Sequence, residues 1–411
     1  LIALKELVIG DNSLNGLSAL RLDGLSGLQR VVVGSNSFKN SDSNSMLVVR
    51  DCSALRSVTL GSNSFASFGV MEIERVPLLE ELSVGDGCLK NVDALNLSGL
   101  SGLKRVVIGS SSFSEKSGVL SLRECERVEA LTIGSGSFSA FTSFEVEGVP
   151  LLGELSVGSE CFSGVSELKL EALRGLKKVE IGDDSFTSKE GDFSLRNCSA
   201  LTELRVGRYS FSDYSSCEIE NVDALEVIEM GELNSESFNF HSASLELNGL
   251  MKLKSLLIGK ESFEKCDRVV FENLPVLTSV QMGWNAFKFN DDNAESALIV
   301  RNLTQLVSLT TTIESGANEC FGYPRHIVLE NLPSLSTVIL QRAFQYSDDI
   351  RVSNVFSSSY EKRMSICSEN EWLQLDPTVT HLTVNSNCLN ELTALPLNRL
   401  IALKELLIGD N

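Results

Sequence analysis

A phrase of eleven residues recurs along the chain and limits what the chain can fold into. It reads L-x-x-Φ-x-Φ-G-x-x-S-F, where Φ is an apolar residue, and it returns every 24 or 25 residues over most of the sequence. The clearest copies lie at 28–38, 55–65, 103–113, 176–186, 201–211 and 253–263, and looser copies lie at 79–89, 152–162 and 277–287. A unit of this length cannot bury an apolar face alone, so successive units must stack.

A second phrase, Φ-x-Φ-x-x-Φ, lies just upstream of the first, for example at 20–25, 95–100 and 245–250. Both phrases alternate apolar and polar residues, which predicts short strands. The Gly should permit a turn, and the Phe should point inward as a large apolar plug. These turn and plug residues are Gly34, Phe38, Gly61, Phe65, Gly109, Phe113, Gly134, Phe138, Gly182, Phe186, Gly207, Phe211, Gly259 and Phe263. Each unit is therefore predicted to be one coil of a mostly β repeat solenoid with parallel pairing between coils.

Three coils were duplicated together as a block of 73 residues. Residues 52–124 align without gaps with 125–197, and about half of the positions are identical. The coil phrases run through 1–340 and become less regular after about residue 300. Residues 341–378 lack them and are predicted to form an irregular insertion or a cap-like segment. The phrases resume in 379–411.

The first and the last twelve residues of the chain have nearly the same sequence. Residues 400–411 read LIALKELLIGDN and repeat residues 1–12 at every position except one. We therefore expect the chain to be a window from a longer tandem array. About fifteen coils separate the two copies, which predicts an axial advance of roughly 70 Å at the usual strand spacing of ~4.8 Å.

The coil phrases resemble leucine-rich repeats. The I-G-x-x-S-F ending is most similar to the BspA-like class, whose units carry I-G-x-x-A-F, and the likeness covers the chain outside about 341–375. The chain departs from that class by its Ser in place of Ala and by lacking Pro after the first strand, and it has only a partial Asn ladder. The resemblance implies leucine-rich-repeat-like parallel β coils. It also implies binding or assembly rather than catalysis, because similar proteins are surface or secreted adhesion and recognition proteins or cytosolic scaffolds.

Ten cysteines are present, but their spacing argues against five disulfides. Cys52, Cys125 and Cys198 fill one slot of the three-coil block, and Cys88 and Cys161 fill another. Residues in one slot should lie about 14 Å apart, beyond disulfide reach, so they are predicted to be small buried fillers. Unpaired thiols favour a reducing compartment, whereas the family resemblance favours an extracellular or cell-surface location, and the localisation stays open.

The sequence offers no recognisable catalytic or metal-binding motif. Its three histidines lie in different coils, and no nucleophile or phosphate-binding motif follows a strand. We expect no enzyme activity and no cofactor. The net charge of −20 argues against a nucleic-acid partner. No run of 18 apolar residues occurs, so no membrane-spanning segment is predicted.

A charged stripe is the candidate interaction site. Its basic members are Arg30, Lys104, Arg105, Lys177, Lys178 and Lys254, and its acidic members are Glu80, Glu81, Glu154 and Glu226. The two signs alternate with the three-coil rhythm. The stripe is either a solvated face inherited with the duplication or a docking face for a periodic protein partner, such as a second copy.

Three functions fit the sequence to different degrees. The first is a non-enzymatic structural or assembly protein, a segment of a tandem array that forms filaments or a surface layer by end-to-end or lateral self-association. The alternative is a recognition or adhesion module that binds a protein or glycan on its exposed strand face. An ice-binding row of serines such as Ser35, Ser110 and Ser135 is the weakest, because Thr-x-Thr arrays are missing.

Overall fold

The computed structural model describes residues 3–40, 42–313, 318–386, 388–389, 394–395 and 397–409. The first two residues of the opening phrase and the last two of the closing phrase lie outside this set. The chain divides into two compact units, Leu1–Val222 and Asp223–Asn411. Each is described by itself.

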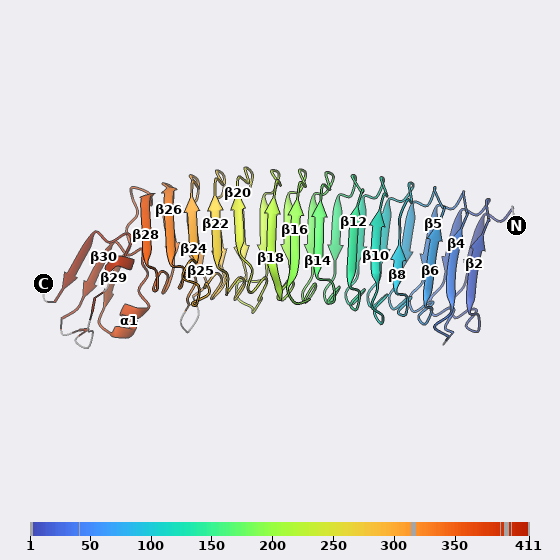
Figure 1. The fold of residues 1–411 in the computed structure, drawn as a ribbon, viewed down its shortest axis with the longest axis horizontal. Helices are drawn as coiled ribbons and strands as arrows, with labels where there is room; N and C mark the ends of the chain where they lie inside the picture. The colour runs from blue at the N-terminus through green and yellow to red at the C-terminus, as the bar shows by residue number, and fades with distance from the viewer. Residues whose placement is uncertain are drawn as a thin grey trace. The chain divides into compact units, whose positions relative to one another are not determined.

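The first unit is a ladder of coils with two strands in each coil (Figure 1). One sheet runs in the order β1-β3-β5-β7-β9-β11-β13-β15-β17, and all printed pairings are parallel. Its strands are β1 (Glu6–Ile9), β3 (Arg30–Val33), β5 (Ser57–Leu60), β7 (Glu81–Val84), β9 (Arg105–Ile108), β11 (Ala130–Ile133), β13 (Glu154–Val157), β15 (Lys178–Ile181) and β17 (Glu203–Val206).

The other strand of each coil belongs to a second face, which is interrupted after every three strands. The three sheets are β2-β4-β6, β8-β10-β12 and β14-β16-β18. Their strands are β2 (Ala19–Asp23), β4 (Met46–Arg50), β6 (Val70–Glu74), β8 (Ala94–Asn96), β10 (Val119–Arg123), β12 (Ser143–Glu147), β14 (Glu167–Glu171), β16 (Gly191–Arg196) and β18 (Tyr214–Glu220). The interruption has the same three-coil period as the duplicated block.

The second unit begins with coils of the same two-strand kind and ends in a small separate sheet. One sheet holds β19 (Val227–Met230), β21 (Ser255–Ile258), β23 (Ser279–Met282), β25 (Ser308–Thr311) and β27 (Thr337–Ile339). The other holds β20 (Leu245–Asn248), β22 (Arg268–Glu272), β24 (Ala297–Arg301), β26 (His326–Leu332) and β28 (Asp349–Val355). The predicted repeat solenoid of parallel β coils is thus confirmed.

The core lies between the two strand faces. In the first face, the second and fourth residues of a strand point inward, and Val31 and Val33 of β3 are each only 1% exposed. The phenylalanines of the coil phrase are fully buried and stack on one another from coil to coil, with ring centroids 4.4 Å apart for Phe38 and Phe65. Each ring is therefore packed by its counterpart in the next coil, as repeat stacking requires.

Left-handed residues turn the chain at the corners of the coils, with three of them in most coils of the first unit. In one coil these are Asn36, Phe38 and Asp51, with φ of 58°, 55° and 53°. Asn and Asp tolerate this region, whereas a left-handed Phe costs roughly 1–2 kcal/mol. The stacking of the buried Phe rings offsets that strain.

The Gly of the coil phrase has a different role from the predicted turn. Gly61 and Gly109 lack a positive φ. A Cβ on Gly61 would lie 2.5 Å from the nitrogen of Ser35, and one on Gly109 would lie 2.5 Å from the nitrogen of Asp86. Glycine is needed because the backbone of the preceding coil passes too close for any side chain.

The end of the chain forms a small sheet with its own core. β29 (Arg363–Ile366), β30 (His381–Val384) and β31 (Glu405–Ile408) pair in parallel, and α1 (Glu369–Leu373) and the 3-10 helix η1 (Leu397–Arg399) lie between them in sequence. Their core includes Trp372, Leu382 and Leu400. Residues 341–378 therefore contain β28, β29 and α1, and whether they arose as an insertion or as a cap stays a prediction.

One disulfide joins Cys367 to Cys388 across this small sheet. The spacing of the cysteines in the regular coils gave no indication of it. The other eight cysteines are free and buried, including all five in the two duplicated slots.

Candidate functional site

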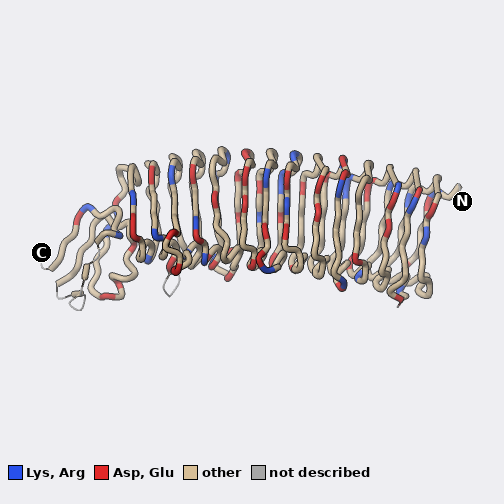
Figure 2. The backbone as a smooth tube through the Cα atoms, viewed as in Figure 1, with Lys and Arg blue, Asp and Glu red and all other residues tan. Residues whose placement is uncertain are grey.

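Lysine and arginine residues are interspersed with aspartate and glutamate along the coils (Figure 2). The charged stripe lies at the start of the first-face strands. Arg30, Glu81, Arg105, Glu154 and Lys178 are the first residues of β3, β7, β9, β13 and β15. Each of Glu80, Lys104, Lys177, Glu226 and Lys254 lies one residue before its strand. The parallel register places residues of opposite charge side by side, with Glu81 opposite Arg105 and Glu154 opposite Lys178.

Ion pairs between neighbouring coils connect several members of the stripe. Glu80 accepts from Arg56 at 2.5 Å and from Lys104 at 2.8 Å. These hydrogen bonds, with Lys104 as the larger cause, hold the pKa of Glu80 below its usual value. Lys254 donates to Glu226 at 2.5 Å and lowers the pKa of that carboxyl. Such exposed pairs contribute little stability each.

Not every charge of the stripe is matched across coils. Lys178 donates to Glu180 of its own strand at 2.6 Å, and this bond raises the pKa of Lys178. Arg105, Glu81, Glu154 and Lys177 are exposed. Within each unit, members of the stripe on adjacent coils thus lie side by side, and part of their charge is compensated within the chain.

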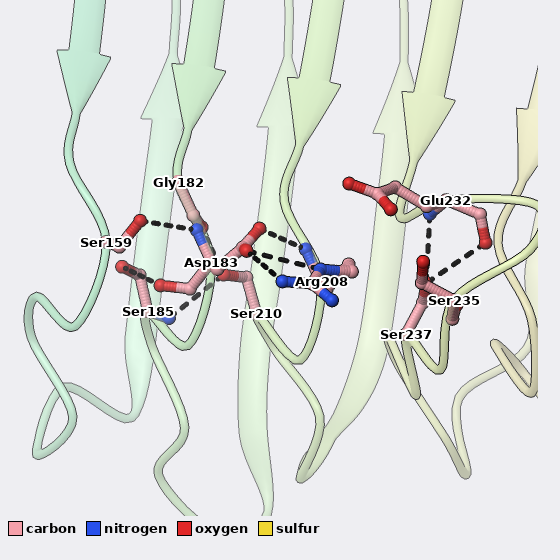
Figure 3. A network of polar contacts seen from close by, with 9 residues as sticks. All are labelled: Ser159, Gly182, Asp183, Ser185, Arg208, Ser210, Glu232, Ser235 and Ser237. Carbon is pink, nitrogen blue, oxygen red and sulfur yellow. Dashed lines mark hydrogen bonds and ion pairs between the residues drawn. The ribbon is translucent and has the colours of Figure 1, made fainter.

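A ladder of hydroxyl groups runs inside the corner of the coils that follows the first-face strands. Ser185 donates its backbone N–H to Ser210 Oγ at 2.9 Å, and Ser210 Oγ donates to the carbonyl of Gly182 at 2.5 Å (Figure 3). Each buried serine therefore binds two neighbouring turns. We call this arrangement the corner ladder. The sequence signal for it is the small residue, most often Ser, before the Phe.

The first residue after each Gly forms an outer rung of the same corner. Asp183 donates its N–H to Ser159 Oγ at 3.1 Å and accepts from the backbone N–H of Arg208 at 2.8 Å. Its other oxygen binds the guanidinium of Arg208 at 2.9 Å. Ser35, Ser110 and Ser135, the serines of the hypothetical ice-binding row, occupy this position, and Ser135 Oγ accepts from the N–H of Ser159 at 3.1 Å.

A related corner lies in the second unit. Ser237 Oγ accepts from the N–H of Glu232 at 2.9 Å and contacts the carbonyl of Ser235 at 2.9 Å (Figure 3). Residues 232–237 form a longer loop than in the regular coils, and Ser237 closes this loop. The corner-ladder position of this coil, before the plug Phe240, is taken by Asn239, whose N–H donates to Ser262 Oγ at 3.2 Å.

Two of the cysteines take part in the corner ladder. Cys88 and Cys161 stand where other coils have Ser, and their thiols contact the carbonyls of Gly61 at 3.2 Å and Gly134 at 3.4 Å. Burial raises the pKa of each thiol to about 11. They are therefore weak hydrogen-bond donors rather than reactive nucleophiles.

An asparagine ladder follows the second-face strands of the second unit. Asn273 donates to Asn248 at 3.1 Å, Asn302 to Asn273 at 2.9 Å and Asn331 to Asn302 at 3.2 Å. Asn354 completes it with a bond of 2.9 Å to Asn331. The sequence indicated only a partial ladder, and the structure places the continuous part in this unit.

Side chains cover the outer edge of β27, which is the last first-face strand of the second unit. Lys362 donates to the carbonyl of Val338 at 3.0 Å, and Asp376 accepts from the N–H of Leu340 at 2.8 Å. Lys362 and Asp376 also bind one another at 2.5 Å, and the Asp376 side chain is 6% exposed. An ion pair thus takes the hydrogen bonds that another strand would have made with β27.

Two grooves lie where the second face of the first unit is interrupted. One of about 670 Å³ lies between β12 and β14 and is lined by Glu145, Glu147, Glu167 and Lys169 among others. The other, of about 540 Å³, lies between β6 and β8. The grooves are related by the duplicated three-coil block.

The two nearly identical phrases form two outer strands, β1 and β31, which we call the end strands. Each is the last strand of its sheet within the described residues. Val8 in β1 is 61% exposed and Ile408 in β31 is 64% exposed, although the position of Ile408 in the coil corresponds to the buried Val33. Edge strands with exposed apolar residues are templates for pairing.

The described residues include no group of three His, Cys, Asp or Glu placed to hold a metal ion. In that same part of the chain, no helix is long and apolar enough to cross a membrane.

Comparison with known proteins identifies no family. No family model and no curated protein matches the chain. Among solved structures it is similar to CroV588, a circular leucine-rich-repeat protein, with 13% identity over 94% of this chain and 70% of that chain and a TM-score of 0.20. A likeness this weak carries no argument about function, and the description as a leucine-rich-repeat-like solenoid rests on the chain's own phrases and coils.

Proposed function

We propose that the protein is a non-enzymatic structural or assembly protein, one segment of a longer tandem leucine-rich-repeat array. Its repeat would continue end to end and build a filament or a surface layer. Within the leucine-rich repeats we assign it to the BspA-like class, on the I-G-x-x-S-F phrase. Its partner is then another protein segment of the same kind.

The end strands carry this proposal. The residues of β31 repeat those of β1 with a single change, and each strand leaves one edge without a partner among the described residues. In the regular coils the corresponding apolar side chains are buried by a neighbour, as Val33 is. Covering such side chains contributes roughly 25 cal/mol per Å² of apolar surface, so continuation of the array is favoured.

The experiment is electron microscopy of the purified chain at increasing concentration. Continuation predicts rods whose axial repeat is roughly 70–80 Å, because coils advance by ~4.8 Å. Isolated short particles at every concentration would contradict end-to-end continuation and favour the recognition function.

The charged stripe supports a second, lateral mode of association. We propose it because exposed charges of both signs recur with the three-coil period. Reversing Lys104, Arg105, Lys177 and Lys178 to Glu should abolish lateral association at low salt, where exposed charges are least screened. Unchanged lateral packing in the quadruple variant would eliminate this mode.

The alternative function is recognition or adhesion at a cell surface. The paired grooves favour it, because they offer polar recesses at a fixed interval along one face. A partner with matching spacing would bind both at once and gain affinity from the second contact. A glycan and peptide array screened with the intact chain would test this function.

A further inference from the structure

The groove between β12 and β14 is an opening within the second face of the first unit, where two adjacent coils do not complete their sheet (Figure 1). On the first face of the same two coils, β13 and β15 pair over their whole length, from Glu154 to Val157. Among the described residues, no backbone hydrogen bond joins β12 to β14. The two coils are therefore joined on one face and open on the other.

Backbone groups of β14 point into this opening. Ala172, which follows β14, donates its N–H at 3.0 Å to the carbonyl of Arg196 in β16, so its amide faces away from the groove. Alternate residues of a parallel strand bond to opposite neighbours, so Glu167, Lys169 and Glu171 turn their backbone groups toward β12. Polar backbone groups without a strand partner require another partner, either water or a ligand.

Acidic side chains border the groove on both strands. The four carboxylates of its lining are Glu145 and Glu147 from β12 and Glu167 and Glu171 from β14. The two basic residues of the lining, Arg123 and Lys169, already bind carboxylates of this set. The Glu147 side chain is 76% exposed, and Glu171 is exposed and has no ion-pair partner among the described residues. The groove therefore keeps a surplus of negative charge.

The spacing of these carboxylates matches that of an extended peptide. Glu145 and Glu147 are two residues apart on one strand, a separation of ~6.6 Å. A peptide lying along the groove in the same conformation places its own alternate side chains at this interval. Arginine suits these positions best, because its guanidinium has five donors and can bind a carboxylate and a backbone carbonyl together.

We infer that the β12–β14 groove binds an extended basic segment of a partner protein, whose alternate arginines reach the carboxylates at the rim and the backbone carbonyls of the open strand edges. The inference rests on the alternative recognition function and names the class of its partner. It does not depend on end-to-end assembly.

The groove between β6 and β8 provides a comparison within the same unit. Glu72 and Glu74 of β6 occupy the positions of the two β12 carboxylates, 73 residues earlier in the sequence. The opposite wall, however, has Ala94, Asn96 and Ser98 in place of the Glu-x-Lys-x-Glu of β14. Because this wall contributes no carboxylate, the β6–β8 groove should bind a basic segment more weakly.

The test is isothermal titration calorimetry of the intact chain with a synthetic peptide of four alternating Arg-Ser pairs. The inference predicts one strong site per chain. The control peptide has four Arg followed by four Ser and therefore the same charge and composition. It should bind roughly threefold more weakly or worse, because only half of its arginines face one side of an extended chain.

Substitutions then locate the site. Glu147→Gln with Glu171→Gln should weaken binding of the alternating peptide by roughly threefold to tenfold, because two exposed charge pairs are lost. The matched control, Glu126→Gln with Glu160→Gln, removes two exposed carboxylates outside the lining and should leave the affinity unchanged.

The reverse substitution creates a site instead of removing one. Ala94→Glu with Ser98→Glu supplies the missing carboxylates to the β6–β8 groove. Titration of this variant should show two strong sites for the alternating peptide, and an unchanged single site would count against the inference.

Equal weakening by the two pairs of Gln substitutions, or equal affinity for the two peptides, would indicate diffuse attraction to a chain of net charge −20 and would overturn the inference. Absence of peptide binding would overturn it as well. Binding of a neutral or acidic ligand in the array screen would in that case leave the recognition function standing.

Discussion

At the scale of single residues, small side chains are required at the corners because adjacent coils lie very close. Gly61 has no room for a Cβ, and the buried Ser185 binds the carbonyl of Gly158 at 2.9 Å. The residue types of the G-x-x-S-F phrase are therefore determined by contacts between coils. The residues lie in a turn of their own coil, but packing against the adjacent coil requires them to be small.

Gly61→Ala should destabilise the first unit by about 1–3 kcal/mol, since the new methyl group must displace backbone atoms of the preceding coil. The measurement is the urea midpoint followed by circular dichroism. Gly16→Ala is the control, because nothing lies within 4 Å of a Cβ there. Equal midpoints for the two variants would mean that the coils can separate at no cost.

The buried thiols predict a loss of stability at alkaline pH. Burial raises the pKa of Cys88, Cys161 and Cys198 from 9.0 to about 11. Their stabilising contribution is complete below pH 9, and it is lost as the pH rises through 11, because the unfolded chain releases these protons first. At pH 10 the loss should be about 1 kcal/mol for each thiol.

The measurement is the free energy of unfolding by urea between pH 7 and 10.5. Replacing all three cysteines by serine should make the free energy of unfolding fall less steeply with pH than in the unchanged chain. The difference between the two proteins cancels the contribution of every other titrating group. Identical slopes for both proteins would show that the thiols are not buried as described.

At the scale of elements, edge strands decide where the regular coils stop. β27 is followed by the Lys362–Asp376 pair instead of another first-face strand. The pair is mostly buried and satisfies a carbonyl and an amide of the edge. Its position explains why the phrases that resume near residue 379 form a separate sheet.

Asp376→Ala should destabilise the second unit by about 3 kcal/mol, because Lys362 would stay buried without its partner. Hydrogen exchange of the Leu340 amide, followed by mass spectrometry, should become faster in the same variant. Asp349→Ala removes the more exposed ion pair with Arg351 and should cost less than about 1 kcal/mol. A mild effect of Asp376→Ala would mean that this pair does not close the edge.

At the scale of the whole molecule, the three-coil duplication governs both faces of the first unit. The second face is interrupted after every third strand, and the charges on the first face follow the same period. Assembly would extend this order beyond one chain, since each unit of a repeat protein contacts only its neighbours.

End-to-end assembly predicts that the small terminal sheet becomes more stable as protein concentration rises, because association favours the paired state by mass action. Hydrogen exchange at the amides of Lys404 and Gly409 should slow between about 1 and 100 μM, concentrations that span typical weak affinities. The amide of Gly182, which donates to Val157 inside the first unit, is the control and should not change. Concentration-independent exchange at all three amides would contradict assembly through β31.

Much of the fold could be predicted from the repeats, and much less of the site. The alternation of apolar residues indicated both strands of each coil, since burial imposes a period of two on any strand. The charged stripe was visible as a pattern, but whether Glu80 meets Arg56 and Lys104 depends on the register between coils. The disulfide of Cys367 and Cys388 was missed because Cys367 lies outside the repeated phrases, although Cys388 fills the same slot as Cys88.

By itself the sequence determined the coil, its period and the parallel stacking, because these follow from short-range patterns repeated along the chain. Only the tertiary structure decided why Gly61 is glycine, where Cys88 finds its acceptor and how Asp376 closes β27. Each of these depends on atoms that lie one coil or more away in sequence. Local patterns specify which face of a strand is buried, whereas the contacts between coils depend on backbone distances that exist only after the coils have stacked.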